Sequence, residues 1–333
     1  MSGEYHLDSD GLTCENNTWS RAYVIGDVHG DLAALLEVFT QLQLIDEQAL
    51  WVGPEGTLVL LAGDLIDRGG DSTNLVAFLH RLQAGANNAN SHIELLLGNH
   101  EVMAAVGDYR YLCPMEGARL ADLWIDERNG PNAIFRGNSV YARWLRHCPM
   151  VVRVGETLVI HAGVEEQMES HSIAALNELA RHWMAYFQGV SPTCPADADW
   201  ILDDYGPLWT RAFDRLATPT QHSMTKGRLR QLLAGFGASR LAVGHCPTVD
   251  VDFRIATDHP TYGDAVINLD TGISYCYQGR LAALELTASG TREHYFERGC
   301  SQDLLALVRR QCSTAIREAA AKHAGDQASL EAA

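Results

Sequence analysis

The sequence contains little positive charge. Its 333 residues include 25 lysines and arginines but 42 aspartates and glutamates, which gives a formal net charge of −17 at pH 7. Proteins that bind the backbone of a nucleic acid need a positively charged surface, so this balance argues against a nucleic acid as partner. Phosphate can still bind locally, because metal ions and a few arginines can reverse the sign of the charge within one site.

Long hydrophobic runs are also missing. No apolar stretch approaches the ~20 residues that a membrane-spanning helix needs. The first twenty residues are polar and acidic, without the basic start and apolar centre of a signal peptide. We therefore expect a cytoplasmic protein with no membrane partner. Hydrophobic residues still make up 47% of the chain, which is enough for the core of one large α/β domain or of two ordinary domains.

The cysteines form no C-x-x-C pair. They are scattered along the chain as Cys14, Cys113, Cys148, Cys194, Cys246, Cys276, Cys300 and Cys312. This spacing supports neither a zinc ribbon nor a dense disulfide framework. Reduced thiols are the simpler interpretation, and they agree with a cytoplasmic protein.

The sequence does contain a repeated pattern of an apolar strand, a glycine and polar residues. Residues 21–25, 57–62 and 93–97 read as strands, each followed by a glycine, and stretches with helical spacing join them. This pattern predicts a β-α-β-α-β array with parallel strands, whose functional groups gather at the carboxyl ends. Further strands are expected over residues 150–154, 157–160, 240–243, 265–269, 273–277 and 281–286.

The residues at the strand ends form a mixed set of nitrogen and oxygen ligands. They are Asp27, His29, Asp64, Asn99, His161 and His245. Such a set suits manganese, iron or zinc, and the two oxygens of Asp64 could bridge two ions. We expect two divalent or trivalent metal ions, with manganese favoured for activity. A hydroxide that bridges them could attack phosphate in line.

Other polar residues near these positions fit the remaining roles in phosphate ester hydrolysis. Arg68 and Arg211 could clamp phosphate oxygens, together with Asn99. His100 could protonate the leaving oxygen, and Asp67 could orient His100 and raise its pKa. The alternative for Asp67 and Arg68 is a surface ion pair of little consequence.

Residues 108–148 interrupt the alternation of strands and helices. This insertion is rich in aromatic residues and arginines, and we interpret it as a substrate wall in which Tyr109 and Arg110 contact the substrate. A small core of its own is the alternative. The whole chain then divides into an N-terminal arm (1–20), a catalytic domain (21–300), and a C-terminal helix and tail (301–333).

Several of these segments carry a family resemblance. Those that resemble the first three motifs of the PPP-type phosphoprotein phosphatases are Gly26–Gly30 (GDVHG), Gly63–Gly69 (GDLIDRG) and Gly98–Glu101 (GNHE). His161–Gly163 resembles the fourth motif, with Ala162 as a conservative departure, and Gly244-His245 resembles the last ligand motif. The resemblance implies a calcineurin-like four-layer αββα sandwich, a dinuclear metal site at the strand ends, and hydrolysis of phosphomonoesters.

Three further segments resemble the bacterial-type Shewanella-like branch of this superfamily: Glu101–Met103 with the following Gly107–Tyr111, Gly206–Arg211, and Asp270–Gly272. Thr210 and Ala212 depart from that branch beside Arg211. The resemblance implies a protein phosphatase with phosphotyrosine activity, which acts on a phosphorylated protein or a small phosphoester.

Three alternatives accompany this interpretation. A symmetric dinucleoside tetraphosphate hydrolase is similar in the first motif, but the Asp67-Arg68-Gly69 and His100-Glu101 pairs favour the phosphatase. A metal-dependent nuclease would need a basic groove, which the net charge of −17 opposes. A non-catalytic phosphoprotein-binding module would be expected to lack a ligand or His100, and none is missing.

Overall fold

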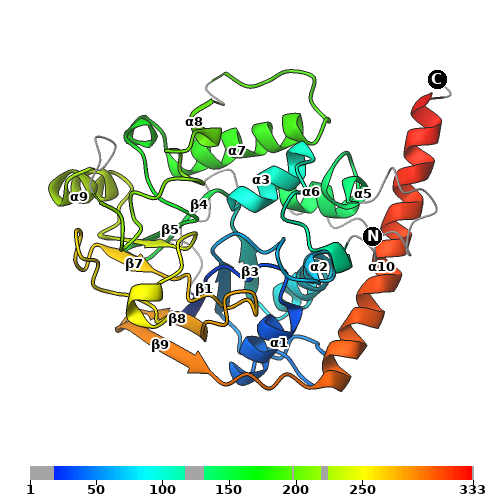
Figure 1. Ribbon diagram of the computed structural model, residues 1–333, viewed down its shortest axis with the longest axis horizontal. Helices are drawn as coiled ribbons and strands as arrows, with labels where there is room; N and C mark the ends of the chain where they lie inside the picture. The colour runs from blue at the N-terminus through cyan, green and yellow to red at the C-terminus, as the bar shows by residue number, and fades with distance from the viewer. Residues whose placement is uncertain (1–18, 117–130, 197–198, 219–223, 332–333) are drawn as a thin grey trace.

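The computed structural model describes residues 19–116, 131–196, 199–218 and 224–331 (Figure 1). Residues 1–18 of the expected N-terminal arm and residues 117–130 of the expected insertion lie outside these ranges.

The larger of two β-sheets has five strands in the order β3-β2-β1-β8-β9. Its strands are β1 (Arg21–Ile25), β2 (Thr57–Leu61), β3 (His92–Leu95), β8 (Leu281–Thr287) and β9 (Gly290–Phe296). β1, β2 and β3 are parallel, and β8 pairs antiparallel with β1 and with β9. The predicted β-α-β-α-β array is therefore confirmed.

The smaller sheet has four strands in the order β4-β5-β6-β7. They are β4 (Val151–Val154), β5 (Thr157–Ile160), β6 (Arg240–Val243) and β7 (Val266–Asn268). β5, β6 and β7 are parallel, and β4 joins the edge as an antiparallel hairpin partner of β5. The carboxyl ends of β5 and β6 lead directly to His161 and His245.

The two sheets pack against each other through alternate residues of their strands. In β1, Val24 belongs to an apolar cluster shared with strands of the other sheet, whereas Ile25 belongs to the larger cluster that includes the helices. Leu60 and Leu61 of β2 divide in the same way. This period of two is what a strand buried on both faces requires, and it produces the four layers of an αββα sandwich.

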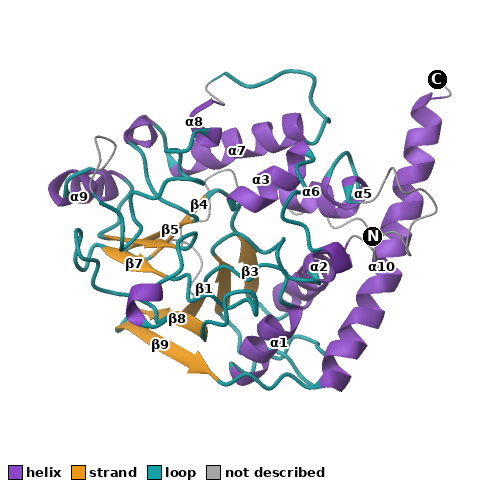
Figure 2. Cartoon of the chain, in the orientation of Figure 1, coloured by secondary structure: helices purple, strands orange, loops and turns teal. Residues whose placement is uncertain are grey.

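Helices cover the outer faces of both sheets (Figure 2). They are α1 (Leu32–Gln41), α2 (Ser72–Asn88), α3 (Asn99–Val106), α5 (Asn132–Phe135), α6 (Val140–Arg146), α7 (Ile173–Phe187), α8 (Asp199–Leu202), α9 (Lys226–Gly235) and α10 (Gln302–Glu331), with short 3₁₀ helices η1 (Glu166–Ser170) and η2 (Val249–Val251). α1 and α2 contact the larger sheet, and α7 and α9 contact the smaller one. Within the described residues, no helix combines the length and the hydrophobicity needed to cross a bilayer.

One expected strand is wrong and one strand was not expected. Residues 273–277 form a turn, because their polar groups bond to the loop after β1 instead of to a neighbouring strand. The Ser274 hydroxyl donates to the His29 carbonyl at 3.3 Å, and the Tyr275 N–H donates to Asp31 Oδ2 at 2.8 Å. β9 pairs with β8 but its residues are mostly exposed, so they lack the apolar pattern that would predict a strand.

The carboxylate of Glu101 joins the ends of β2 and β3. Glu101 is fully buried in the first turn of α3. Its Oε2 accepts the N–H groups of Asp64 and Gly98, both at 2.9 Å, and its Oε1 accepts that of Leu65 at 2.9 Å. The N–H of Ile66 adds a longer bond of 3.3 Å. One buried side chain thus satisfies backbone donors of two neighbouring loops, which fixes both loops relative to each other.

We predict that Glu101→Gln destabilises the fold by about 2–4 kcal/mol. Both carboxylate oxygens of Glu101 accept backbone N–H groups, and in the variant an NH₂ group would face the N–H groups that one of these oxygens now binds. The measurement is denaturant unfolding of the metal-free protein, at a pH above the value of about 7 to which burial raises the pKa of Glu101.

Glu94→Gln is the matched control, since the buried Glu94 carboxylate has the His92 side chain as its hydrogen-bond partner. Equal losses in both variants would contradict a special role of Glu101.

Candidate metal centre

The loops that follow the strands adopt a backbone conformation that is rare for residues with a side chain. The φ angles are 45° at His29, 48° at Asp64, 71° at Asp67, 64° at Arg68 and 67° at His245. Such left-handed geometry costs roughly 1–2 kcal/mol per residue and persists only where the surroundings hold it. Its concentration at the strand ends marks this edge of the two sheets as a functional site.

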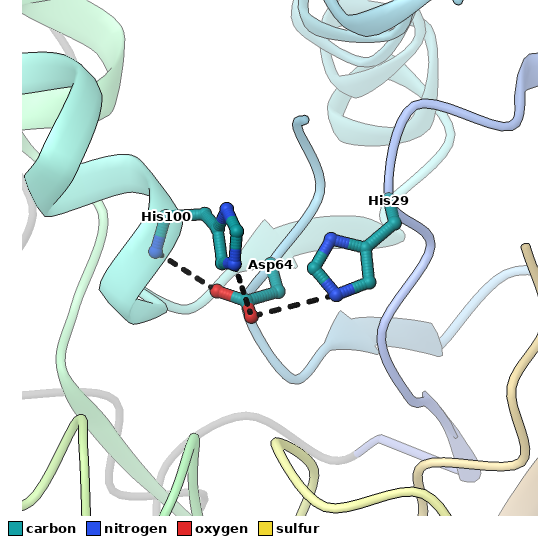
Figure 3. A group of neighbouring side chains, drawn as sticks. All are labelled: His29, Asp64 and His100. Atoms are coloured by element: carbon teal, nitrogen blue, oxygen red, sulfur yellow. Dashed lines mark hydrogen bonds and ion pairs between the residues drawn. The ribbon is translucent and has the colours of Figure 1, made fainter. Parts of the chain in front are cut away.

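Asp64 lies at the centre of the site and shares its carboxylate between two groups of ligand atoms. One group contains His29, Asp64 and His100, and the other contains Asp64, His161 and His245. Figure 3 shows the first group, in which His29 Nε2 and His100 Nε2 lie 3.7 and 3.8 Å from Asp64 Oδ2. In the second group, His161 Nε2 lies 3.4 Å from Asp64 Oδ1. Asp64 therefore has the position of a bridging carboxylate.

Each of the three expected histidine ligands uses one ring nitrogen to bind a backbone carbonyl. His29 Nδ1 lies 3.1 Å from the Ile66 oxygen, His161 Nδ1 lies 2.9 Å from the Ala62 oxygen, and His245 Nε2 lies 3.1 Å from the Trp209 oxygen. A carbonyl only accepts, so this nitrogen carries a proton, and in a neutral ring the other nitrogen turns a lone pair toward the site. Histidines that ligate metals are oriented in this manner.

The side chain of Asn99 supplies the test of whether a metal fits. One end of its amide lies 3.0 Å from His161 Nε2, 3.2 Å from Asp64 Oδ2 and 3.3 Å from His245 Nδ1. With the amide nitrogen at this end, Asn99 donates to the Asp64 carboxylate and to the two ring nitrogens. With the oxygen at this end, Asn99, Asp64 and the two histidines offer a mixed oxygen and nitrogen set that suits a divalent transition metal.

Asp27 lies beside the second group and belongs to neither. Both of its carboxylate oxygens accept the N–H of His245 at 3.1 Å. Burial and the nearby Asp270 carboxylate raise the pKa of Asp27 well above its ordinary value. Burial also raises the pKa of Asp270, to about 6. The site thus concentrates more buried carboxylates than the protein neutralises with its own cations, as expected where metal ions bind.

The histidines around Asp64 have opposite electrostatic behaviour. Burial lowers the pKa of His29 and of His245 to about 3, so both are neutral and able to ligate. Burial opposes protonation of His161 as well, but the Asp64 carboxylate raises its pKa to about 10. Burial alone would raise the pKa of Asp64, yet the His161 and His100 side chains hold it well below its ordinary value.

His100 and Asp67 form a pair at the edge of the metal groups. His100 Nδ1 lies 2.7 Å from Asp67 Oδ2, and Nε2 lies 3.4 Å from Arg68 Nη2. Burial lowers the pKa of His100, but the Asp64 and Asp67 carboxylates outweigh it and raise the pKa above its ordinary value. The pair has the geometry of an oriented general acid, with its second nitrogen facing the site.

A cavity of about 590 Å³ opens onto these residues, a size typical of small-molecule sites. Its lining includes Asp64, Arg68, Asn99, His100, Arg211 and His245, together with Tyr111, Asp204, Tyr205, Trp209 and Asp214. The structure thus brings together both expected phosphate-binding arginines and the expected acid.

The structure does not bring Tyr109 and Arg110 to this cavity. The Tyr109 hydroxyl donates to Asn132 at 2.9 Å and its ring packs near Phe135, whereas exposed Arg110 pairs with Asp108. Tyr111 lines the cavity in their place, and its ring lies 5.6 Å from the Arg68 guanidinium carbon and 5.3 Å from the His100 ring.

Sequence reasoning also assigned no role to Glu101, Asp204 or Asp214. For Glu101, the signal available was its place directly after the Asn99-His100 pair, in the first turn of a helix. The two aspartates carry no comparable signal, because they come from a long connection whose path over the cavity depends on tertiary packing.

Comparisons with known proteins agree with this geometry. The sequence profile of calcineurin-like phosphoesterases matches residues 20–247. Shewanella-like protein phosphatase 2 of Arabidopsis thaliana is 27% identical, over 82% of this chain and 76% of its own length. A symmetrical bis(5'-nucleosyl)-tetraphosphatase of Ralstonia nicotianae is 26% identical, over 84% of this chain and 94% of its own length.

Among solved structures, the fold is similar to that of a cold-active protein-tyrosine phosphatase of a psychrophilic Shewanella species. The TM-score is 0.67 at 22% identity, over 84% of this chain and 80% of the other. Members of the matching family bind divalent metals in a dinuclear site, to which the two groups around Asp64 correspond. The chain therefore belongs to the calcineurin-like phosphoesterase family and is a phosphoric monoester hydrolase.

Proposed function

We propose that this chain is a protein phosphatase that hydrolyses phosphotyrosine. The proposal rests on the position of Asp64. This residue is shared by the two groups of ligand atoms, and it lines the same cavity as Arg68 and Arg211. Metal ions and arginines together offer the positive charge that a transferring phosphoryl group needs.

In this proposal the residues that would hold the metals are Asp27, His29, Asp64, Asn99, His161 and His245. Two bound ions, for which we favour manganese, would neutralise the phosphate and activate water. Arg68 and Arg211 bind the outer phosphate oxygens. The oxygen of water joins phosphorus and loses a proton to solvent as the bond to the leaving oxygen breaks. Nε2 of His100 gives its proton to the leaving oxygen. Asp67 holds His100 through Nδ1.

The aromatic part of the cavity supports phosphotyrosine as the substrate. Tyr111, Tyr205 and Trp209 all line the cavity, and they offer flat apolar surfaces against which a phenyl ring could pack. The similarity to a Shewanella protein-tyrosine phosphatase supports the same proposal.

A symmetric dinucleoside tetraphosphate hydrolase is the second candidate, because the Ralstonia relative matches most of this chain. The charge of the cavity disfavours it. The cavity lining contains the positive charges of Arg68 and Arg211 but also the negative charges of Asp204 and Asp214. The additional phosphates of a tetraphosphate would therefore be repelled by these two carboxylates.

The cellular setting that we propose is the cytoplasm, with a phosphorylated protein as the partner. Seven cysteines lie within the described residues, and all are free. Free thiols in this number favour a reducing compartment.

We predict that Asp64→Asn removes metal binding and turnover together, because the variant loses the charged carboxylate shared by both groups. Metal content after dialysis and hydrolysis of a phosphotyrosine peptide are measured on the same preparation. Asp303→Asn, a change of an exposed residue in α10, should leave both unchanged. Full turnover by the Asp64 variant would be incompatible with the proposed mechanism.

His100→Asn separates acid catalysis from metal binding. We predict unchanged metal content and a kcat lower by about 100-fold or more, the usual contribution of a positioned acid. Exposed His182 supplies the control variant His182→Asn. Because His100 lies in one of the two ligand groups, loss of one metal in His100→Asn would instead identify it as a ligand.

The substrate is tested by kcat/KM for a phosphotyrosine peptide, its phosphoserine counterpart and diadenosine tetraphosphate, in manganese after removal of other metals by chelation. We expect the phosphotyrosine peptide to be the best of the three. A higher value for the dinucleotide would establish the second candidate, and metal-dependent turnover of none would favour a phosphoprotein-binding module.

A further inference from the structure

We propose that Arg309, on the C-terminal helix α10, is a positioning residue that holds the Asp67–His100 pair in its active geometry. The inference rests on the proposed function, because it gives Arg309 a part in proton donation to the leaving oxygen. Arg309 is remote from the metal ligands in sequence and does not line the cavity.

The first link is a two-point ion pair between Arg309 and Asp71. Arg309 Nε lies 3.0 Å from Asp71 Oδ1, and Nη2 lies 2.6 Å from Oδ2. The Asp71 side chain is only 8% exposed. A guanidinium that meets both carboxylate oxygens fixes the orientation of the carboxylate as well as its charge.

The next links lead from Asp71 to His100. Asp71 is the N-cap residue of α2, and its N–H donates to the Gly30 carbonyl at 3.0 Å. The adjacent Ser72, fully buried, accepts the N–H of Asp67 on its hydroxyl oxygen at 2.9 Å. Asp67 in turn accepts from His100 Nδ1. The orientation of His100 therefore depends on where α2 begins.

A second buried carboxylate makes the charge of Arg309 important at this helix start. Glu116 is fully buried and accepts the Thr73 N–H at 3.0 Å and the Thr73 hydroxyl. Asp71 and Glu116 thus both lie at the beginning of α2, where Arg309 contributes a positive charge to the pair. The hydrogen bonds and the charge of Asp71 raise the pKa of Arg309, and the charge of Glu116 acts in the same direction.

The loop between Asp64 and Ser72 needs such support because of its backbone geometry. Asp67 and Arg68 both have positive φ angles, which residues with a side chain seldom adopt unless neighbours hold them. Glu101 holds the first part of this loop through the N–H groups of Leu65 and Ile66. In the second part, the Arg68 N–H donates to the Tyr111 carbonyl at 2.8 Å and the Gly69 N–H donates to the His29 carbonyl at 2.9 Å. A shift of α2 would remove the bond from the Asp67 N–H to Ser72.

Helix α10 is itself fixed independently of Arg309. Its buried residues Leu305, Val308, Cys312 and Ile316 recur at spacings of three and four, the pattern of one helix face. This face packs along α2 and contacts α5 (Figure 1). Removal of the guanidinium thus leaves the docking of α10 in place and changes the restraint on Asp71.

The experiment compares two phosphate esters that differ in their need for an acid. Phosphotyrosine leaves as a basic phenolate that needs the proton of His100, whereas dinitrophenyl phosphate leaves without one. For Arg309→Ala we expect kcat to fall by about tenfold on phosphotyrosine and by less than about twofold on the dinitrophenyl ester, at unchanged metal content. Arg309→Lys, which keeps the charge without the two-point contact, should fall between Arg309→Ala and the wild type.

Arg310→Ala is the control, because Arg310 is exposed on the same helix and its side chain has no ion pair with the described residues. It should behave as the wild type. An equal decrease of kcat on both esters would overturn the inference, because Arg309 would then have only a structural role. No decrease of kcat on either ester would overturn it as well, because Arg309 would then have no role in catalysis. If Arg309→Ala does not fold, the same comparison is made with Arg309→Lys. A wild type that hydrolyses neither ester would instead refute the proposed function.

Discussion

The buried carboxylate of Glu101 is the constraint on which the geometry of the site depends. Backbone N–H groups at the ends of β2 and β3 have no strand partner, and burial would make them costly if they stayed unpaired. The Glu101 carboxylate accepts hydrogen bonds from N–H groups at the ends of both strands. It thereby holds Asp64 next to Asn99 and His100, so that side chains from two separate loops lie within hydrogen-bond distance of each other.

Close backbone contact makes this convergence possible. A Cβ atom on Gly98 would lie 2.3 Å from the Asp64 nitrogen, and one on Gly30 would lie 2.7 Å from the Gly69 oxygen. No larger residue fits at either place without displacement of a ligand loop. Two glycines and one acid thus set how closely the loops after β1, β2 and β3 approach one another.

The charge balance of the site links metal binding to stability. Asp27, Asp64 and Asp270 are all buried, and burial raises the pKa of Asp27 and Asp270 because each carboxylate lacks a sufficient positive neighbour. Ions that bind only the folded chain stabilise it by mass action. A protein with a formal net charge of −17 thus gains local positive charge from ions that it collects at one edge.

The sequence predicted the strands and their polar ends well, because burial on both faces leaves an unbroken apolar pattern. The parallel order of β1, β2 and β3 follows from the helices between them. The same reasoning failed for Ile273–Tyr277, which is apolar enough for a strand but bonds to the loop after β1.

The positions of side chains that depend on contacts between distant parts of the chain could not be predicted from the sequence. Tyr109 and Arg110 were expected at the substrate, but the turn after α3 directs Tyr111 to the cavity instead. The pairing of Asp71 with Arg309 joins positions 238 residues apart. No local pattern indicates such a contact.

The position of β8 has a consequence for how this chain reaches its native state. β1 pairs with β8 from Ala22 opposite Leu286 to Val24 opposite Leu284, so β1 gains its second neighbour only after all the residues between these two strands have been synthesised. Pairings this distant in sequence are slow to form and leave strand edges exposed meanwhile. During synthesis, the edge of β1 that pairs with β8 therefore stays open until β8 has emerged.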